Sequence, residues 1–419
     1  MQSVRLLSMQ DRNLMEAFGY QDNYSPEAWL ASESFVENVS RNINASGQLR
    51  WDTPIKGLSL TGKAGVTYWT KYDKTYRAET YFDENKTVGP STLNIWTSNN
   101  TNTILEALVN YEKTFGSHDL KVLAGTSVEQ TSNKGLEGYR NTFPNNALYQ
   151  LGAGDASTAT NNSSLEEYAL VSFFGRVNYA FKDKYLLEAN LRYDGSSRFA
   201  KDNRWGIFPS VSAGWRISEE NFWKNTRAGE VVNNLKLRAS YGVLGNQNIG
   251  VYPYQQTYDL DHNYPLGNPA TLVPGTYVST YRNQDLTWEK TAITNVGLDF
   301  GLFNNTLNGS IEYFYKYTSD ILAPVEKAGI LGQNVSESNV GAVSNKGIEV
   351  NLSYNGRIGR DFQFSIAPNF TWVKNAVEEL ANGATEEINN NRIVGQPIGI
   401  IYGYQTEGCS LIRQKLMRL

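Results

Sequence analysis

Alternation of apolar and polar side chains over residues 168–199 is the feature that most limits what this chain can fold into. The odd positions are almost all apolar or aromatic, and the even positions are mostly polar or charged. The pattern holds on both sides of a short turn at 182–184. A period of two places one kind of side chain on each face of a β-strand. The segment therefore predicts a β-hairpin with one apolar face and one polar face.

The same alternation predicts about twelve long strands, joined by connections whose lengths alternate between short and long. Antiparallel neighbours joined in this way place every short turn at one end and every long loop at the other, as in bacterial outer-membrane barrels. The expected strands are 43–52, 58–72, 104–115, 119–130, 166–181, 184–196, 204–217, 233–243, 287–302, 305–318, 345–357 and 361–374. The short connections are 54–57, 116–118, 182–184, 303–305 and 356–360, the intermediate ones 197–203 and 218–232, and the long ones 73–103, 131–165, 244–286, 319–344 and 375 onward.

Strand length and aromatic placement favour a membrane. Strands in soluble sheets are typically about 5–6 residues long, whereas a tilted strand needs roughly 9–11 residues to cross a bilayer. Aromatic residues of the apolar phase gather at the strand ends, as they do in the two girdles of membrane barrels. Those near the short turns are Trp51, Phe115, Phe181, Tyr185, Phe300, Tyr354 and Phe362, and those near the long loops are Tyr72, Tyr193, Trp205, Tyr241, Trp288, Tyr317 and Trp372.

These patterns predict an all-β fold, an antiparallel transmembrane β-barrel. The apolar face would meet lipid, and the polar face would line a lumen. An open sheet edge in hydrocarbon leaves backbone groups unpaired at a cost of several kcal/mol each, so the sheet has to close.

Composition agrees with this interpretation. A chain of 419 residues usually forms two or three domains, although barrels are exceptions. The net charge is −4 and no basic block is present, which argues against nucleic-acid binding. No run approaches 18 apolar residues, so transmembrane helices are excluded. The mean hydropathy of −0.46 is low because half of each barrel strand is polar.

Cysteine and histidine are too scarce to build common sites. Cys409 is the only cysteine, so neither an intramolecular disulfide nor a cysteine zinc site can form. His118 and His262 stand in expected turns and are expected to be exposed polar residues rather than metal ligands. The N-terminus lacks the apolar core of a signal peptide, so we expect the chain to be part of a longer product.

Several longer motifs carry a family resemblance. They are LRYDGSSRF (191–199), WGIFPSVSAGWRIS (205–218), ENFW (220–223), LKLRASYGVLGNQNIG (235–250), LTWEKT (286–291), NVGLDFGLFNNTLNGSIEYFYKYTSDIL (295–322), NVGAVSNKGIEVNLSYN (339–355) and VGQPIGIIYGY (394–404). In this order and spacing they resemble the SusC/RagA family of TonB-linked (TonB-dependent) outer-membrane transporters. The resemblance extends from about residue 35 to Gly408.

The motifs also have a local physical interpretation, and all of it is architectural. Asp194-Gly195 and the following Ser-Ser-Arg are expected to turn the chain at the outer rim, and 345–347 is expected to do the same before a strand. The Asn residues of the 302–305 turn tolerate left-handed geometry. Small residues would leave room in the lumen beside one strand: Gly206, Ser210, Ser212 and Gly214.

The resemblance implies properties that the strands alone do not. Its members have an N-terminal plug inside a barrel of 22 strands, which implies that this chain holds about twelve or thirteen of them. TonB grips a segment in front of the plug and uses the inner-membrane proton gradient to drive uptake. A SusD-like lipoprotein covers the extracellular mouth and presents substrates, commonly oligosaccharides and sometimes peptides. The implied location is the outer membrane.

The chain departs from the family pattern at both ends. No signal peptide, plug-like stretch or TonB-contacting segment is evident, and the CSLIRQKLMRL tail neither alternates nor ends in an aromatic residue. We therefore expect three parts and interpret the chain as a fragment. These are an irregular, loop-like segment at 1–42, a partial TonB-dependent receptor barrel at 43–408, and an atypical tail at 409–419 produced by truncation or a frameshift.

Neither enzyme chemistry nor a cofactor is indicated. Paired acids such as Asp259 and Asp261, or Glu386 and Glu387, suit a glycosidase, but in such loops they are expected to be solvated surface residues. No motif of a serine hydrolase, a zinc protease or a phosphate-binding loop is present. Catalytic, cofactor and metal residues are therefore not assigned.

The long loops hold the better ligand candidates. Tyrosine rings suit sugar stacking and amides suit hydroxyl hydrogen bonds, although the same side chains could pack on one another or on the lid lipoprotein. No substrate-binding residue is assigned. The tyrosines concerned are Tyr252, Tyr254, Tyr258, Tyr264, Tyr277 and Tyr281.

Two functional hypotheses follow. In the first, the chain belongs to a TonB-linked importer that takes up oligosaccharides or peptides with a SusD-like lipoprotein. In the second, the same strands form a passive porin-like or surface-adhesive β-barrel. Loops rather than strands select a substrate, so the strands leave its identity open.

Overall fold

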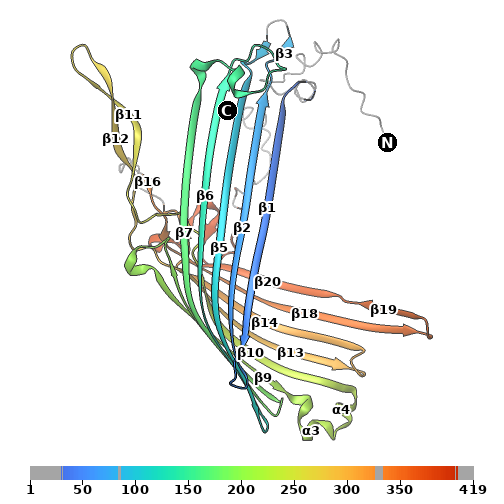
Figure 1. Cartoon of the computed structure of the whole chain (residues 1–419). Coiled ribbons are helices and arrows are strands. Elements are labelled where there is room, and N and C mark those ends of the chain that lie inside the picture. Colours follow the sequence, from blue (N-terminus) through green and yellow to red (C-terminus); the bar gives the residue numbers. More distant parts are fainter. Residues whose placement is uncertain (1–29, 31, 84–85, 326–333, 402, 404–419) are drawn as a thin grey trace, which may run out of the picture. The chain divides into compact units, whose positions relative to one another are not determined.

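A computed structural model describes residues 30, 32–83, 86–325, 334–401 and 403. Within these residues the main sheet has thirteen strands in the order β1-β2-β5-β6-β7-β8-β9-β10-β13-β14-β18-β19, and β20 also pairs with β18 (Figure 1). The strands are β1 (Phe35–Asp52), β2 (Leu58–Arg77), β5 (Thr92–Phe115), β6 (His118–Asn141), β7 (Thr160–Phe181), β8 (Tyr185–Ser196), β9 (Trp205–Arg216), β10 (Val232–Asn246), β13 (Glu289–Leu302), β14 (Leu307–Ser319), β18 (Ala342–Ile358), β19 (Phe362–Ile366) and β20 (Asn369–Glu379). Each strand lies beside its neighbour in the chain, as the alternating connections predict.

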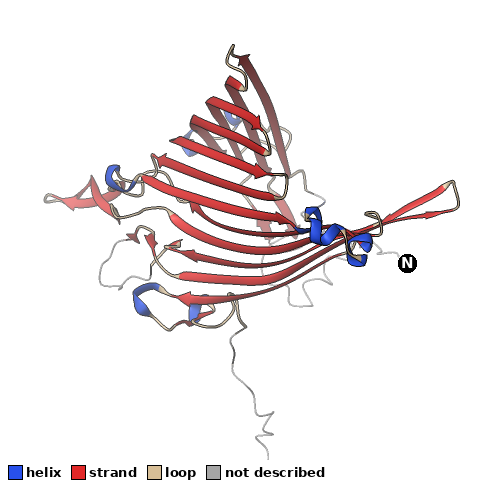
Figure 2. Ribbon diagram, turned by 90° about the horizontal axis from the view of Figure 1, so that it is seen from below, coloured by secondary structure: helices blue, strands red, loops and turns tan. Residues whose placement is uncertain are grey.

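The chain divides into two compact units, and β1, β2, β5, β6 and β7 contribute residues to both. Unit 1 comprises 1–49, 63–105 and 128–169, and unit 2 comprises 50–62, 106–127 and 170–419. The short helices lie at the ends of strands and not over a sheet face (Figure 2). No helix within the described ranges combines the length and apolarity needed to cross a membrane.

Unit 1 has a small core at the long-loop ends of its strands. Tyr76, Ala78, Leu93 and Phe143 are buried together, and the Phe143 ring meets Tyr76 edge-on with ring centroids 5.7 Å apart. The β6–β7 connection packs there through Leu151 and Ala153 of η2 (Leu151–Ala153), and η3 (Ala156–Thr158) follows it. A hairpin of β3 (Thr80–Asp83) and β4 (Lys86–Val88) completes this end.

Unit 2 confirms the alternation predicted for residues 168–199. In the β7–β8 hairpin, outward Phe173 pairs with Tyr193 and both are exposed, whereas Ser172 pairs with Asp194 and both are buried. Lys182 and Asp183 have positive φ, which gives the 182–184 turn a twist that matches the strands. The hairpin therefore has one exposed apolar face and one polar face.

Several strands extend at least five residues beyond their expected spans, among them β2, which continues to Arg77 and not to 72. β1 begins at Phe35, so residues 35–42 are strand and not irregular, and β5 begins at Thr92 rather than at 104. β6 continues to Asn141 and β7 begins at Thr160. The physical reason is that backbone pairing needs no apolar face in water, so period-two hydropathy reveals a strand only where one of its faces meets lipid.

Two further boundaries differ from expectation. The strand expected at 361–374 is interrupted between β19 and β20 at Ala367-Pro368, because proline lacks the N–H that a ladder needs, although the register continues across the break. The long connection 244–286 contains a hairpin of β11 (Thr257–Leu266) and β12 (Thr271–Tyr281). It extends away from the main sheet of unit 2 (Figure 1). β16 (Asn334–Val335) pairs in parallel with β12, β15 (Leu322–Ala323) pairs with β17 (Ser338–Asn339), and β21 (Glu386–Glu387) pairs with β22 (Arg392–Ile393).

Gly195 and residues 345–347, expected in turns, are strand interior instead, whereas Ser197 and Arg198 do turn the chain after β8. Gly195 lies inside β8 without positive φ, and an added Cβ would lie 2.7 Å from atoms of the Trp205 ring. Residues 345–347 lie inside β18, where a Cβ on Gly347 would overlap the Trp372 carbonyl oxygen and the Phe314 ring. These glycines therefore permit close approach of neighbouring strands rather than reversal of the chain. The 302–305 turn is confirmed, with positive φ at Phe303, Asn304 and Asn305.

A carboxylate organises one short-turn end of unit 2. Glu220 follows η5 (Ile217–Glu219) and precedes α3 (Asn221–Lys224) and α4 (Arg227–Val231). It accepts hydrogen bonds from the Tyr185 hydroxyl at 2.6 Å, Lys184 Nζ at 2.9 Å and Trp215 Nε1 at 3.2 Å. The hydrogen bonds from Tyr185 and then Lys184 stabilise the charged form and lower the pKa of Glu220 to about 2.

This hydrogen bonding predicts a pH-dependent stability. The folded-state pKa of Glu220 lies below its ordinary value of 4.5, so its stabilisation is present above pH 4.5 and is lost as the pH falls toward 2. We expect Glu220→Gln to lower the unfolding temperature at pH 7 and to converge with the unsubstituted protein near pH 2. Glu230→Gln, an exposed carboxylate in α4, is the control and should change nothing. If Glu220→Gln lowered the unfolding temperature equally at both pH values, the stabilising role of the charged Glu220 would be contradicted.

Close approach at Gly347 predicts a second effect. Gly347→Ala should lower the free energy of unfolding by about 1–3 kcal/mol, the usual cost of overpacking, because a backbone oxygen cannot move aside. Gly62→Ala is the matched control, since its Cβ would meet no atom within 4 Å, and it should stay within about 0.5 kcal/mol. Denaturant unfolding in detergent measures both, and equal stability of the two variants would refute the packing argument.

Candidate functional site

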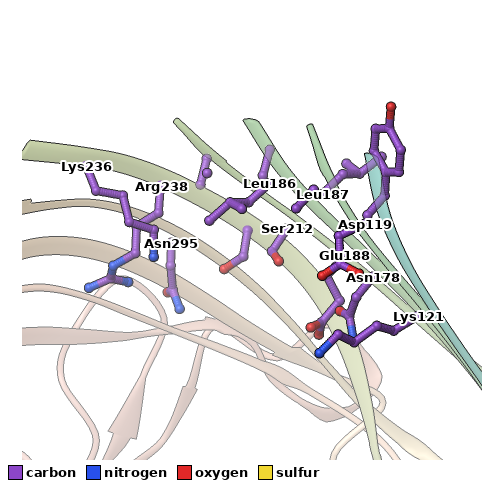
Figure 3. A pocket seen from close by; sticks show the side chains of 16 residues that line it. Asp119, Lys121, Asn178, Leu186, Leu187, Glu188, Ser212, Lys236, Arg238 and Asn295 are labelled. Atoms are coloured by element: carbon purple, nitrogen blue, oxygen red, sulfur yellow. The ribbon is translucent and has the colours of Figure 1, made fainter. Parts of the chain in front are cut away.

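The polar face of unit 2 carries an open cavity of about 420 Å³ (Figure 3). Residues from β6 to β10 and from β13 line it, and alternation along the strands directs the side chains of one phase, such as Asn178, Glu188 and Lys236, to this face. Ser212 and Gly214 of β9 lie between the charged side chains of β10 and those of β6 and β8. The charged or amide residues that line it are Asp119, Lys121, Asn178, Glu188, Lys236, Arg238 and Asn295.

Beside this cavity, Arg238 joins three strands through ion pairs. Its Nη2 lies 2.5 Å from Glu312 Oε2, and its Nε lies 3.2 Å from Asp299 Oδ1. Lys236 Nζ adds a longer contact of 3.7 Å to Asp299. In the register, Gly297 stands between Arg238 and Glu312, and the guanidinium occupies the space that a side chain there would need. The ion pairs therefore connect β10, β13 and β14 across the polar face.

One acceptor at the cavity has no partner among the residues that the structure describes. Within them, Asn295 Oδ1 is buried without a hydrogen bond, although Asn295 lies directly opposite Ser240 in the β10–β13 register. Buried polar atoms normally have partners, so this oxygen is available to a donor that enters from the polar side. Arg238, Glu312 and Asn295 were not predicted from the sequence to lie together. A signal for this group was present, because Lys236 and Arg238 occupy alternate positions in β10 and β13 carries Asp299.

The expected stripe of small residues is confirmed only in part. Ser212 and Gly214 line the cavity, which leaves room there. Phe208 lies on the same face, however, and its ring fills the space beside Gly206 and Gly245. The open part of this face is therefore confined to the short-turn side of Phe208.

A buried cluster forms the long-loop end of unit 2. Phe199, Phe208, Ile249, Leu286 and Trp288 pack together there, with Phe199 and Leu286 fully buried. The LRYDGSSRF and LTWEKT motifs therefore supply a core beneath the long loops.

The prediction that Trp288 belongs to the aromatic girdle is wrong. Trp288 is only 4% exposed, because it precedes β13 and turns into this core, where its Nε1 donates to the Arg204 carbonyl oxygen at 2.9 Å. Arg198 donates to the Ile249 carbonyl oxygen and connects the same loops.

The loop tyrosines do not converge on one site. Tyr258, Tyr264 and Tyr281 are largely exposed along the β11–β12 hairpin, and Tyr277 contacts His262 with ring centroids 4.1 Å apart. Tyr252 lies at the base of the hairpin with positive φ. The hairpin is thus an exposed aromatic surface and not an enclosed pocket.

Glu386 and His262 agree with the expectation of surface residues, whereas the Glu387 side chain is only 14% exposed and Asp259 is half-buried. Glu386 and Glu387 are adjacent in β21, and Glu387 pairs with Arg392 at 3.5 Å. Asp259 lies opposite Tyr277 in the hairpin. His262 is exposed, although in a strand and not in a turn. Across the described ranges, no three histidine, cysteine or acidic side chains group as a metal site would. Cys409 lies outside the described residues.

The prediction that His118 is exposed in a turn is wrong. It opens β6, is half-buried, and stacks on Phe115 with ring centroids 5.1 Å apart. Its Nδ1 lies 2.7 Å from the Tyr179 hydroxyl. The tight turn places the His118 ring against Phe115 and Phe181 of the aromatic girdle and not in solvent.

Comparison with known proteins identifies the family. A family model described as TonB dependent receptor-like, beta-barrel, matches residues 6–407. The chain belongs to the TonB-dependent receptor β-barrel family. The family is one of transport receptors of the outer membrane and is not an enzyme family.

Two relatives show where in the family the chain lies. It is 34% identical over 322 residues to the TonB-dependent receptor P3 of Formosa agariphila, and 35% identical over 286 residues to the TonB-dependent receptor SusC of Bacteroides thetaiotaomicron. The matches cover 74% and 66% of this chain but 32% and 27% of the relatives. The chain therefore spans about a third of the length of the curated relatives it matches.

Solved structures confirm the fold class and the SusC/RagA resemblance. The RagAB peptide transporter matches with a TM-score of 0.79 and 26% identity, over 89% of this chain and 41% of that chain. The RagAB peptide importer in the open-open state gives 0.78 and 27%, over 88% and 40%. The ferric-catecholate import receptor Fiu of E. coli, at 0.53 and 10% over 86% and 50%, shares the fold alone.

The ion pairs of Arg238 predict a stability effect. Arg238→Met leaves Asp299 and Glu312 without their main partner, and because the arginine is about a third exposed we expect a loss of about 1–2 kcal/mol in the free energy of unfolding. Removing both carboxylate charges as well, with Asp299→Asn and Glu312→Gln, should recover most of this loss. Arg176→Met is the control, because Arg176 has no carboxylate partner among the described residues. An equal effect at Arg176, measured by denaturant unfolding, would argue against the ion pairs.

Proposed function

We propose that this chain forms part of the barrel wall of a TonB-dependent importer in the outer membrane. The importer would take up oligosaccharides or peptides together with a SusD-like lipoprotein. The observation that carries the proposal is the family match over residues 6–407, together with 35% identity to SusC. Because the relatives are longer than this chain, energised uptake belongs to the whole protein of which this chain would be a fragment.

The two faces of the strands support a role in the wall of a transport pore. Large apolar side chains such as Phe173, Leu187 and Trp372 are exposed on one face, as contact with lipid requires. The other face carries the ion pairs of Arg238 and the open cavity, both suited to a lumen that holds water or protein. A passive pore would share these faces, so energy coupling is the property to test.

The long-loop end supports binding of large substrates and of a lid. The exposed tyrosines of the β11–β12 hairpin present faces that stack on sugar rings or on peptide groups. Leu260 and Leu272 are about 70% exposed on the same hairpin, and exposed apolar residues of this kind often mark protein interaction sites. These features support a lipoprotein partner above the mouth.

Uptake by cells tests the proposal. The gene would be inactivated in its host, and uptake of labelled oligosaccharides and oligopeptides would be measured with and without a protonophore. We expect inactivation to abolish uptake of at least one class, and the protonophore to abolish it equally in the intact strain, because TonB draws on the proton gradient. Uptake of a monosaccharide is the control and should be unchanged.

Other outcomes identify the alternatives. Protonophore-insensitive uptake that depends on this gene would indicate a passive porin-like barrel. Unchanged uptake with a loss of surface attachment would indicate an adhesive barrel. Purification of the tagged protein from outer membranes tests the partner, since a SusD-like lipoprotein should co-purify with it.

A further inference from the structure

Two lysines face each other on the apolar face of unit 2. The β18–β20 register places Lys346 directly opposite Lys374, and the β14–β18 register places Tyr315 opposite Lys346 on its other side. The three strands lie side by side (Figure 1). Both lysines are exposed, and neither has an ion pair or hydrogen bond within the part of the chain that the structure describes. Like charges directly opposite each other destabilise a sheet. An anion bound between the two lysines would therefore stabilise this pair.

The height of the pair along the strands is defined by its neighbours. The next pair on the same face, toward the short turns, is Ile348 and Trp372, and both are exposed. The next pair toward the long loops is Ser344 and Ala376. Ser344 is only 7% exposed, and its hydroxyl donates a hydrogen bond to Glu378. The lysines therefore lie where the exposed apolar band ends and the covered loop end begins.

That level corresponds to lipid headgroups. Exposed Tyr315 and Trp372 have the places of girdle residues, and girdles mark the membrane–water interface. Long loops face the cell exterior in barrels of this kind, so the interface is that of the outer leaflet. Beyond Trp372, exposed Phe370 continues the apolar surface toward the short turns and would contact acyl chains.

We propose that Lys346 and Lys374 bind a phosphate group of an outer-leaflet glycolipid, with the Tyr315 hydroxyl as a third donor. One phosphate between the two ammonium groups replaces their repulsion with two charge-assisted hydrogen bonds. The lipid is favoured over free phosphate because the apolar surface directly below the lysines suits its acyl chains. Lipid binding here is separate from transport, since these side chains lie on the face opposite the ion pairs of Arg238.

Lipid binding tests the proposal directly. The full chain would be purified from outer membranes in detergent and titrated with bisphosphorylated lipid A or with its dephosphorylated form, and native mass spectrometry would measure the bound lipid. We expect the phosphorylated lipid to bind and Lys346→Gln with Lys374→Gln to weaken it by at least about tenfold, or about 1.4 kcal/mol. Lys316→Gln is the matched control, because Lys316 lies at a similar height on the polar face, and it should bind normally.

Each other result overturns the proposal. Equal binding of the dephosphorylated lipid would exclude phosphate recognition, and an equal loss in Lys316→Gln would show a nonspecific charge effect. If excess inorganic phosphate bound the protein as tightly as the lipid did, the site would serve free phosphate instead.

A charge reversal separates lipid binding from folding. Lys374→Glu should raise the unfolding temperature in lipid-free detergent, because it removes the repulsion with Lys346, and yet it should lose the phosphorylated lipid. Lys346→Arg with Lys374→Arg should retain the lipid and shows that the fold tolerates change at these positions. Normal lipid binding by Lys374→Glu would refute the proposal even if the double glutamine variant failed to fold.

Discussion

Backbone hydrogen bonding in hydrocarbon is the constraint on which the rest of this structure depends. Peptide groups in lipid have no water to bond to, so every strand that crosses the membrane must pair with a neighbour on each side. Hairpins joined by short turns satisfy this with the least chain, as the β7–β8 register shows residue by residue. Once the ladder exists, the pleat divides the side chains between lipid and lumen. The apolar face, the girdles and the polar wall all follow from that division.

Aromatic side chains next to glycine shape how closely these strands pack. Phe208 covers the positions of Gly206 and Gly245, the Phe314 ring lies against Gly347, and Gly195 accommodates the Trp205 ring. In each case the glycine provides space for a large neighbour, so the family motifs that contain these glycines are packing devices. The same devices place a core under the long loops, where Phe199 and Leu286 are fully buried. A firm base of this kind allows the β11–β12 hairpin to extend into solvent.

Charge is distributed differently on the two faces. On the polar face the charges beside the cavity compensate one another, because Arg238 bonds both Asp299 and Glu312. On the apolar face Lys346 and Lys374 are uncompensated within the described residues, at the height where headgroups lie. The polar wall is therefore suited to molecules that pass through the lumen, whereas the lysine pair is suited to a stably bound anion.

The sequence by itself determined the strands, their faces and the family, because contact with lipid imposes a period of two that the residues display directly. It could not determine strand ends in water, where Thr92 and Thr160 start strands without an apolar phase. It also misplaced Gly195, Gly347, Trp288 and His118, since their roles depend on neighbours contributed by other strands and loops. Only the tertiary structure brought Arg238 to Glu312 and Lys346 to Lys374. Cross-strand register, a product of turn geometry and packing, decides which residues meet.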